Sequence, residues 1–190
     1  MEDLIPRIIA SPKLHLRWLN TLSYLENCGA RKLAAYEHAT LVKEEMLKHA
    51  AEEFRHAYIL KKQMLRLGEI LPTYQRHYLL GGWETIHYLN KLELAICRLL
   101  EDSHRSMAYL LITYAIEKRA EKVYPLYESH LRKENSPICI KSILLEEQGH
   151  LRETEEELAL YKESSVYVNY TLEIEQKIYL SWLSCLQKEL

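Results

Sequence analysis

The sequence predicts an all-α, single-domain protein, built as a four-helix bundle with a long crossover connection and one or two additional helices. Only five glycines and five prolines occur among 190 residues, so the residues that break helices are scarce. Apolar residues recur at helical spacing through most of the chain. One longer segment, residues 69–82, interrupts this pattern with Pro72 and the Gly81–Gly82 pair, and its length suits a crossover.

Two helices are predicted before the crossover. The first runs from Ser11 to about His38, because Ser11 can cap the helix and Pro12 suits its first turn. The second runs from about Thr40 to Gly68, since glycine commonly ends a helix. These two helices form the first predicted hairpin of the bundle.

After the crossover, a helix is predicted from Trp83 to Glu101, followed by a break or a cap at Asp102–Ser103. Helix then resumes to about Lys133. Pro125 lies within this stretch, which predicts a kink or an early end because proline lacks a backbone N–H.

The remaining sequence predicts two more helices. The Ser136–Pro137 pair repeats the start signal of the first helix, and the pattern continues from there to about Glu163. A final packing helix is predicted over residues 171–188. No low-complexity segment or domain boundary interrupts the chain, so residues 1–190 are interpreted as one domain.

Composition argues against several classes of function. The net charge is −2, with both signs mixed along the chain, which does not favour binding to nucleic acid or to an anionic membrane. No apolar run approaches the ~18 residues of a membrane span, and the N-terminus lacks the apolar core of a signal peptide. Four cysteines occur without a Cys-x-x-Cys pair, so they are interpreted as packing residues of a cytoplasmic protein.

Two Glu-x-x-His tetrads carry the chemical signal. They are Glu53-Phe-Arg-His56 and Glu147-Gln-Gly-His150. Residues three apart lie one turn along the same side of a helix, so both side chains of a tetrad can reach one point. Carboxylate together with imidazole suits iron or manganese.

Another glutamate in an apolar row precedes each tetrad by about one helical hairpin. Glu26 precedes Glu53, and Glu117 precedes Glu147. Burying a carboxylate is costly unless it is paired or bound to metal. Four such carboxylates would neutralise two divalent ions, so the repeated unit predicts a two-metal site between the halves of a bundle.

Some assignments stay open at this point. Glu121 lies one turn after Glu117 and could replace it as a ligand. His49 and Tyr114 could lie beside the metals without binding them. Any single Glu-x-x-His could also be a solvated glutamate beside an incidental histidine, and only the paired spacing favours the metal.

This constellation resembles the ferritin-like di-iron carboxylate superfamily over about residues 12–163. That superfamily places a Glu on each of two helices and a Glu-x-x-His on each of two others. The resemblance implies that Glu26 and Glu117 are terminal carboxylates and that Glu53 and Glu147 bridge the metals. It also implies that His56 and His150 each bind one metal.

The resemblance also implies a function. With no cysteine cluster of the rubredoxin type, it favours a stand-alone oxidase or oxygenase that activates O2 at a Glu4His2 site. It implies two iron ions, with manganese as an alternative in one or both positions, a small or partly apolar substrate, an external electron donor, and a monomer or homodimer. The alternatives are an iron-handling ferroxidase or peroxidase, and a metal-free helical interaction protein.

Overall fold

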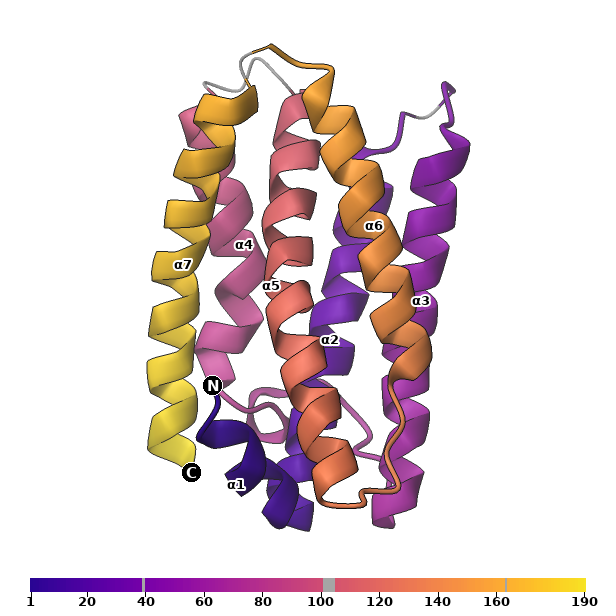
Figure 1. Ribbon diagram of the computed structural model, residues 1–190, viewed down its shortest axis with the longest axis vertical. Helices are drawn as coiled ribbons and strands as arrows, with labels where there is room; N and C mark the ends of the chain where they lie inside the picture. The colour runs from indigo at the N-terminus through magenta and orange to yellow at the C-terminus, as the bar shows by residue number, and fades with distance from the viewer. Residues whose placement is uncertain (39, 101–104, 163) are drawn as a thin grey trace.

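The computed structural model describes residues 1–38, 40–100, 105–162 and 164–190, and every regular element in these ranges is helical (Figure 1). The predicted all-α class is therefore confirmed. The elements are α1 (Leu4–Ala10), α2 (Pro12–Tyr36), α3 (Glu44–Gln63), η1 (Met64–Leu67), η2 (Arg76–Tyr78), α4 (Gly82–Leu99), α5 (Arg105–Lys133), α6 (Lys141–Ala159) and α7 (Ser164–Glu189).

Two long hairpins form one side of the molecule. Helix α2 packs along α3, and α5 packs along α6. Figure 1 shows that α3 and α5 run in the same direction, so the chain must return along the molecule between them. Residues 68–81 and helix α4 make this return, and the short 3-10 helix η2 lies within the connection.

The other side of the molecule consists of α4 and α7, which pack against each other and against α5. In Figure 1 these two helices lie on the side of α5 away from α3, and α1 covers the lower end near both termini. Trp182 of α7 stacks on Trp18 of α2, with ring centroids 6.0 Å apart. This contact joins the α4–α7 pair to the core of the two hairpins.

The structure differs from the sequence-based boundaries in the middle of the chain. Pro125 neither ends nor splits α5, which continues to Lys133. Pro125 is exposed, so the carbonyl that loses its N–H partner can face water. Helix α6 begins at Lys141 instead of Pro137, because Ile138 and Ile140 are buried in the core before the helix starts.

Two further differences lie at the ends of the chain. Helix α1 was not predicted, although Ile5 and Ile8 are fully buried. The final helix α7 begins at Ser164 rather than at residue 171. Its first turns are rich in polar and β-branched residues with weak helix propensity, but Tyr167 and Val168 pack against buried apolar residues. The expected features at Asp102–Ser103 and Glu163 lie outside the described residues.

No helix within the described parts of the chain is both long enough and apolar enough to cross a membrane.

Candidate metal centre

Helices α2, α3, α5 and α6 bring the predicted ligands together in two groups of four. In each group, one ligand atom per residue lies within 4.8 Å of the others. The Glu26 group consists of Glu26, Glu53, His56 and Glu147, and the His49 group consists of His49, Glu53, Glu117 and His150. Glu53 belongs to both groups, so its carboxylate could contribute to binding a metal ion in either one.

The Glu26 group is centred on the imidazole of His56, which is fully buried. Its Nδ1 lies 2.9 Å from Glu147 Oε1, and 3.9 Å from both Glu26 Oε2 and Glu53 Oε1. Glu53 is 6% exposed, and it reaches this point because it lies one turn before His56 on α3. The group therefore offers three carboxylates and one imidazole.

The His49 group contains a histidine that the sequence suggested only as a neighbour of the metals. His49 Nε2 lies 3.4 Å from Glu53 Oε1 and 3.3 Å from Glu117 Oε1. His150 Nδ1 lies 3.4 Å from the same Glu53 oxygen. His49 therefore stands where a ligand would stand, and the complete set is four glutamates and three histidines rather than Glu4His2.

The ligand atoms fit a pair of metal ions because they are buried without hydrogen-bond partners. Buried polar atoms are nearly always hydrogen-bonded. Within the described residues, six site atoms have no such partner: His49 Nε2, Glu53 Oε1, His56 Nδ1, Glu117 Oε2, Glu147 Oε1 and His150 Nδ1. All six atoms belong to residues of the two ligand groups, and their oxygen and imidazole chemistry suits iron or manganese.

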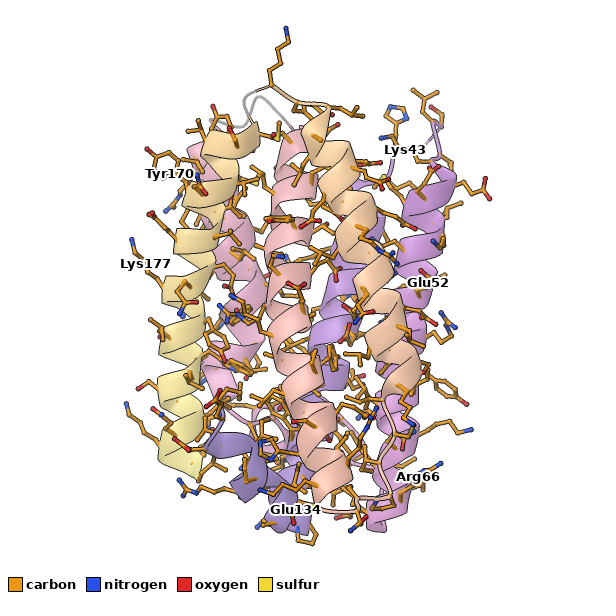
Figure 2. The ribbon with its side chains drawn as sticks, viewed as in Figure 1. Lys43, Glu52, Arg66, Glu134, Tyr170 and Lys177 are labelled. Carbon is orange, nitrogen blue, oxygen red and sulfur yellow. The ribbon has the colours of Figure 1, made fainter. Side chains whose placement is uncertain are left out.

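Two outer carboxylates hold the histidines in a crossed arrangement. His56 Nε2 donates to Glu146 Oε2 of α6 at 2.8 Å, and His150 Nε2 donates to Glu52 Oε2 of α3 at 2.8 Å. Each bond fixes the imidazole with Nδ1 directed at the metal group, as outer partners of metal-binding histidines commonly do. Figure 2 labels Glu52 on the side of the molecule where α3 and α6 lie next to each other.

The sequence contained a signal for these outer carboxylates that the prediction missed. Both tetrads are preceded directly by a glutamate, so the repeated unit is Glu-Glu-x-x-His, at Glu52–His56 and at Glu146–His150. The first glutamate of each unit accepts a hydrogen bond from the histidine of the other unit. Which histidine it reaches depends on how α3 and α6 are rotated against each other.

The carboxylates of the site differ in how readily they ionise. Burial, together with the charges of Glu53 and Glu147, raises the pKa of Glu26 well above its usual value. Burial and the same two neighbours raise the pKa of Glu117. Burial would also raise the pKa of Glu53, but the imidazoles of His150 and His49 outweigh it, and this pKa falls well below the usual range.

Two of the site histidines, His150 and His56, hold protons more tightly because carboxylates lie beside them. Burial alone would lower the pKa of His150, but Glu53 and Glu52 outweigh it and raise this pKa to about 9. The pKa of His56 is also raised, because its carboxylate neighbours, led by Glu147, outweigh its burial. Protons can therefore occupy the positions that metal ions would take, and metal binding would release them.

Tyr124 lies next to the Glu26 group and forms a hydrogen bond with Glu26. This tyrosine of α5 is 3% exposed, and its hydroxyl donates to Glu26 Oε1. Burial, with the charge of Glu26, raises the pKa of Tyr124 well above its usual value. The phenol thus keeps its proton on Oη and holds one oxygen of Glu26, while the other oxygen, Oε2, lies 3.9 Å from His56 Nδ1.

The two remaining candidates lie outside both groups. The side chain of Glu121 is 46% exposed and pairs with Lys118 at 2.9 Å, so Glu117, at 3% exposure, is the residue of α5 that reaches the centre. Tyr114 is partly buried and its ring faces the same lysine. The proposed place of Tyr114 beside the metals has no support in these contacts.

Two cavities reach the centre, and Gly29 lies in the wall of both. A smaller one of about 30 Å³ touches His49 and Glu117, and a larger one of about 90 Å³ touches Glu26 and Tyr124. Gly29 and Glu53 line both. A Cβ atom on Gly29 would lie 3.6 Å from Glu53 Oε2, so the glycine leaves this face of the shared carboxylate open.

No protein-family model, no curated protein and no solved structure matches this chain.

Proposed function

We propose that this chain is a ferritin-like di-metal oxidase or oxygenase, which binds two iron ions and oxidises a small or partly apolar organic substrate with O2. Manganese could replace iron in one or both positions, since their ligand preferences overlap. An external electron donor would supply the reducing equivalents. The protein would act as a monomer or homodimer.

The observation that carries this proposal is the set of six buried ligand atoms without hydrogen-bond partners. A metal-free interaction protein would not need so many carboxylates and imidazoles in its interior, because burying polar atoms without hydrogen bonds costs free energy. When bound, a pair of iron ions would supply the electrons and the binding positions that O2 reduction requires.

The side chains around the ions have separate tasks in this proposal. Glu53 would hold both ions at a fixed separation. Glu52 and Glu146 orient His150 and His56 through the Nε2–H bonds, and Tyr124 orients Glu26. The apolar walls formed by α4, α5 and α7 would keep water away from the centre.

The larger cavity favours an organic substrate over the handling of iron alone. Its walls are mainly apolar and include Leu22, Leu89 and Val123. Iron entering a storage or ferroxidase site needs polar groups along its path, whereas an apolar substrate needs walls of this kind. An iron-handling ferroxidase remains the principal competing outcome of the experiment below.

Anaerobic titration of metal-free protein with Fe(II), followed by exposure to O2 with absorption recorded from the near ultraviolet to the visible, tests the proposal. Saturation near two iron ions per chain and oxo-bridged ferric absorption are expected. Glu53→Ala should abolish this uptake, and Glu156→Ala, at an exposed position of α6, should not. Binding of a single ion without a response to O2 would overturn the proposal.

The competing ferroxidase is separated by a second measurement on the same samples. Size-exclusion chromatography should give a monomer or dimer, and repeated additions of Fe(II) in air should oxidise no more iron than the centre binds. A large cage that accumulates many ferric ions per chain would instead assign the protein to iron storage.

A further inference from the structure

The larger cavity lies beside the candidate metal ligands, and its wall is formed by residues of α2, α3, α4, α5 and α7. It has a volume of about 90 Å³, and Glu26 and Glu53 form part of its wall. We propose that this cavity binds a small, uncharged apolar group, which is the reacting part of the substrate. This assignment rests on the proposed function and adds to it the place where the substrate would bind.

The walls explain why the bound group is apolar. The side chains facing the cavity are predominantly hydrocarbon and aromatic, and they include Leu22, Leu25, Leu89, Ile116, Val123 and Trp182. Three of them are almost fully buried: Trp182 at 4%, and Leu22 and Leu89 at 5%. A hydrocarbon group transferred from water into this space gains the free energy of the hydrophobic effect.

The charge of Arg119, which also lines the cavity, is neutralised by another residue. Its Nε and Nη2 donate to the two oxygens of Glu175 at 2.9 and 2.6 Å. Its guanidinium lies 3.5 Å from the ring centroid of Tyr179, and Tyr88 donates to the same carboxylate. Because Glu175 balances this arginine, the cavity offers no strong attraction to an anionic ligand.

The size of the cavity limits the bound group. An engineered apolar cavity of about 150 Å³ in another protein holds benzene or xenon. With about 90 Å³, this cavity suits xenon or a hydrocarbon group of roughly three to five carbons. Its contact with Glu26 and Glu53 would bring such a group beside the metal position of the Glu26 group.

Helices α4 and α7 thereby gain a role in the site. They contribute Tyr88, Leu89 and Trp182 to the wall. The residues given by the structure for the smaller cavity belong to α2, α3 and α5. The two helices beyond the metal-binding four would therefore determine which substrate fits.

Xenon and 1-butanol are the probes for a direct binding test, with butyrate as the charged counterpart of the alcohol. The readout is the indole N–H signal of each tryptophan in the labelled, metal-free full chain. Trp182 lines the cavity and its Nε1 donates to Thr85 Oγ1 at 2.7 Å. Its signal should shift and saturate with xenon and with 1-butanol, while exposed Trp83 should stay in place and butyrate should have no effect.

Ala120, which also lines the cavity, offers a matched pair of variants. Ala120→Leu should fill the space and weaken xenon binding at least ten-fold, whereas Ala51→Leu, the same change at an exposed position of α3, should leave it unchanged. Ala120→Val adds less volume and should weaken binding several-fold. Circular dichroism identifies any variant that fails to fold, in which case the valine variant decides.

The outcomes separate the two proposals. Absence of a saturable Trp182 shift, or wild-type xenon binding in the folded Ala120 variants, would overturn the cavity assignment even if the protein binds two iron ions. Binding of butyrate as tightly as 1-butanol would overturn the uncharged ligand class. Xenon binding in a protein that takes up no iron would remove the substrate role, because that role requires the metal centre.

Discussion

Glu53 is the residue on which the candidate centre depends most. It is the one carboxylate that belongs to both ligand groups within the described residues. Its low pKa, caused by the imidazoles of His150 and His49 in spite of burial, keeps it ionised and ready to bind metal. The neighbouring carboxyls of Glu26 and Glu117, whose pKa values are raised, must lose protons first.

The outer carboxylates provide a residue-scale prediction. Glu52→Gln and Glu146→Gln each retain the shape of the side chain but weaken the bond to the opposite histidine. We expect metal affinity to fall by roughly 10- to 100-fold, as for other outer partners of metal-binding histidines, with little change in helix content. Isothermal titration with Mn(II) measures the effect, and unchanged affinity in both variants would contradict the orienting role.

The choice between Glu117 and Glu121 provides a second prediction at this scale. Glu117→Gln should reduce metal uptake from two ions to about one per chain, because Glu117 belongs to the His49 group alone. Glu121→Gln should leave uptake unchanged, since that side chain is exposed and pairs with Lys118. Metal analysis after dialysis distinguishes the two, and the reverse pattern would transfer the ligand role to Glu121.

At the scale of elements, the connection between α3 and α4 is fixed by a tight backbone turn. Gly81 has a φ of +77°, and a Cβ atom there would lie 2.8 Å from Thr85 Oγ1 and 2.9 Å from Trp182 Nε1. Thr85 also donates to the carbonyl of Leu80. The start of α4 is thereby tied to α7, which places both helices against the cavity.

Two glycine variants separate backbone strain from crowding. Gly68 also has a positive φ, of +108°, but a Cβ atom there meets nothing within 4 Å. Gly68→Ala should therefore lower the free energy of unfolding by about 1 kcal/mol through backbone strain alone. Gly81→Ala should lower it by a further ~1–3 kcal/mol, as overpacking does. Urea denaturation measures both, and equal losses would contradict the close packing at Trp182.

The bond between α5 and α7 gives another prediction for this scale. Arg119 and Glu175 form a bidentate pair, and Glu175 is 3% exposed. Replacing either partner alone, as in Arg119→Met or Glu175→Leu, should cost about 3–5 kcal/mol, because a buried charge loses its partner. The double variant should lose clearly less than the sum, as a thermodynamic cycle by urea denaturation can measure.

For the whole molecule, metal binding at the candidate centre would be energetically linked to folding. The ligands come from four helices that would otherwise bring several carboxylates close together in the interior. Ions bound only by the folded state stabilise it. The same residues would therefore lower the free energy of unfolding of the metal-free protein and raise that of the metal-bound protein.

This linkage predicts a dependence on pH. The pKa of His150 is raised to about 9, so its stabilising contribution is complete below the usual histidine range and is lost as pH rises toward 9. The raised pKa values of Glu26 and Glu117 act in the same direction. The Tm of metal-free protein should therefore fall between pH 6 and pH 9.

Metal reverses this trend because it takes the place of the protons. The difference in Tm between Mn(II)-loaded and metal-free protein should widen as pH rises from 6 to 9. Differential scanning calorimetry in matched buffers measures both states. A constant difference would mean that metal binding releases no protons from these ligands.

Local sequence determined the all-α class and the residues that the structure places at the centre. The spacing of Glu53 and His56 is a property of one helix. The position of Glu26 next to them, on the neighbouring helix, follows from one antiparallel hairpin. Short-range signals also predicted the start of α2, where Ser11 accepts a hydrogen bond from the Leu14 N–H. Each of these features depends on neighbours close along the chain.

Only the tertiary structure decided the contacts between helices, because these contacts depend on how separate helices are rotated and placed against one another. The bond of Glu52 to His150 requires one rotation of α3 against α6, and the entry of His49 into the centre requires Glu117 from α5. Tyr167 and Val168 keep the start of α7 helical by packing against a distant core. The cavity likewise arises where five helices meet, which no local pattern of residues encodes.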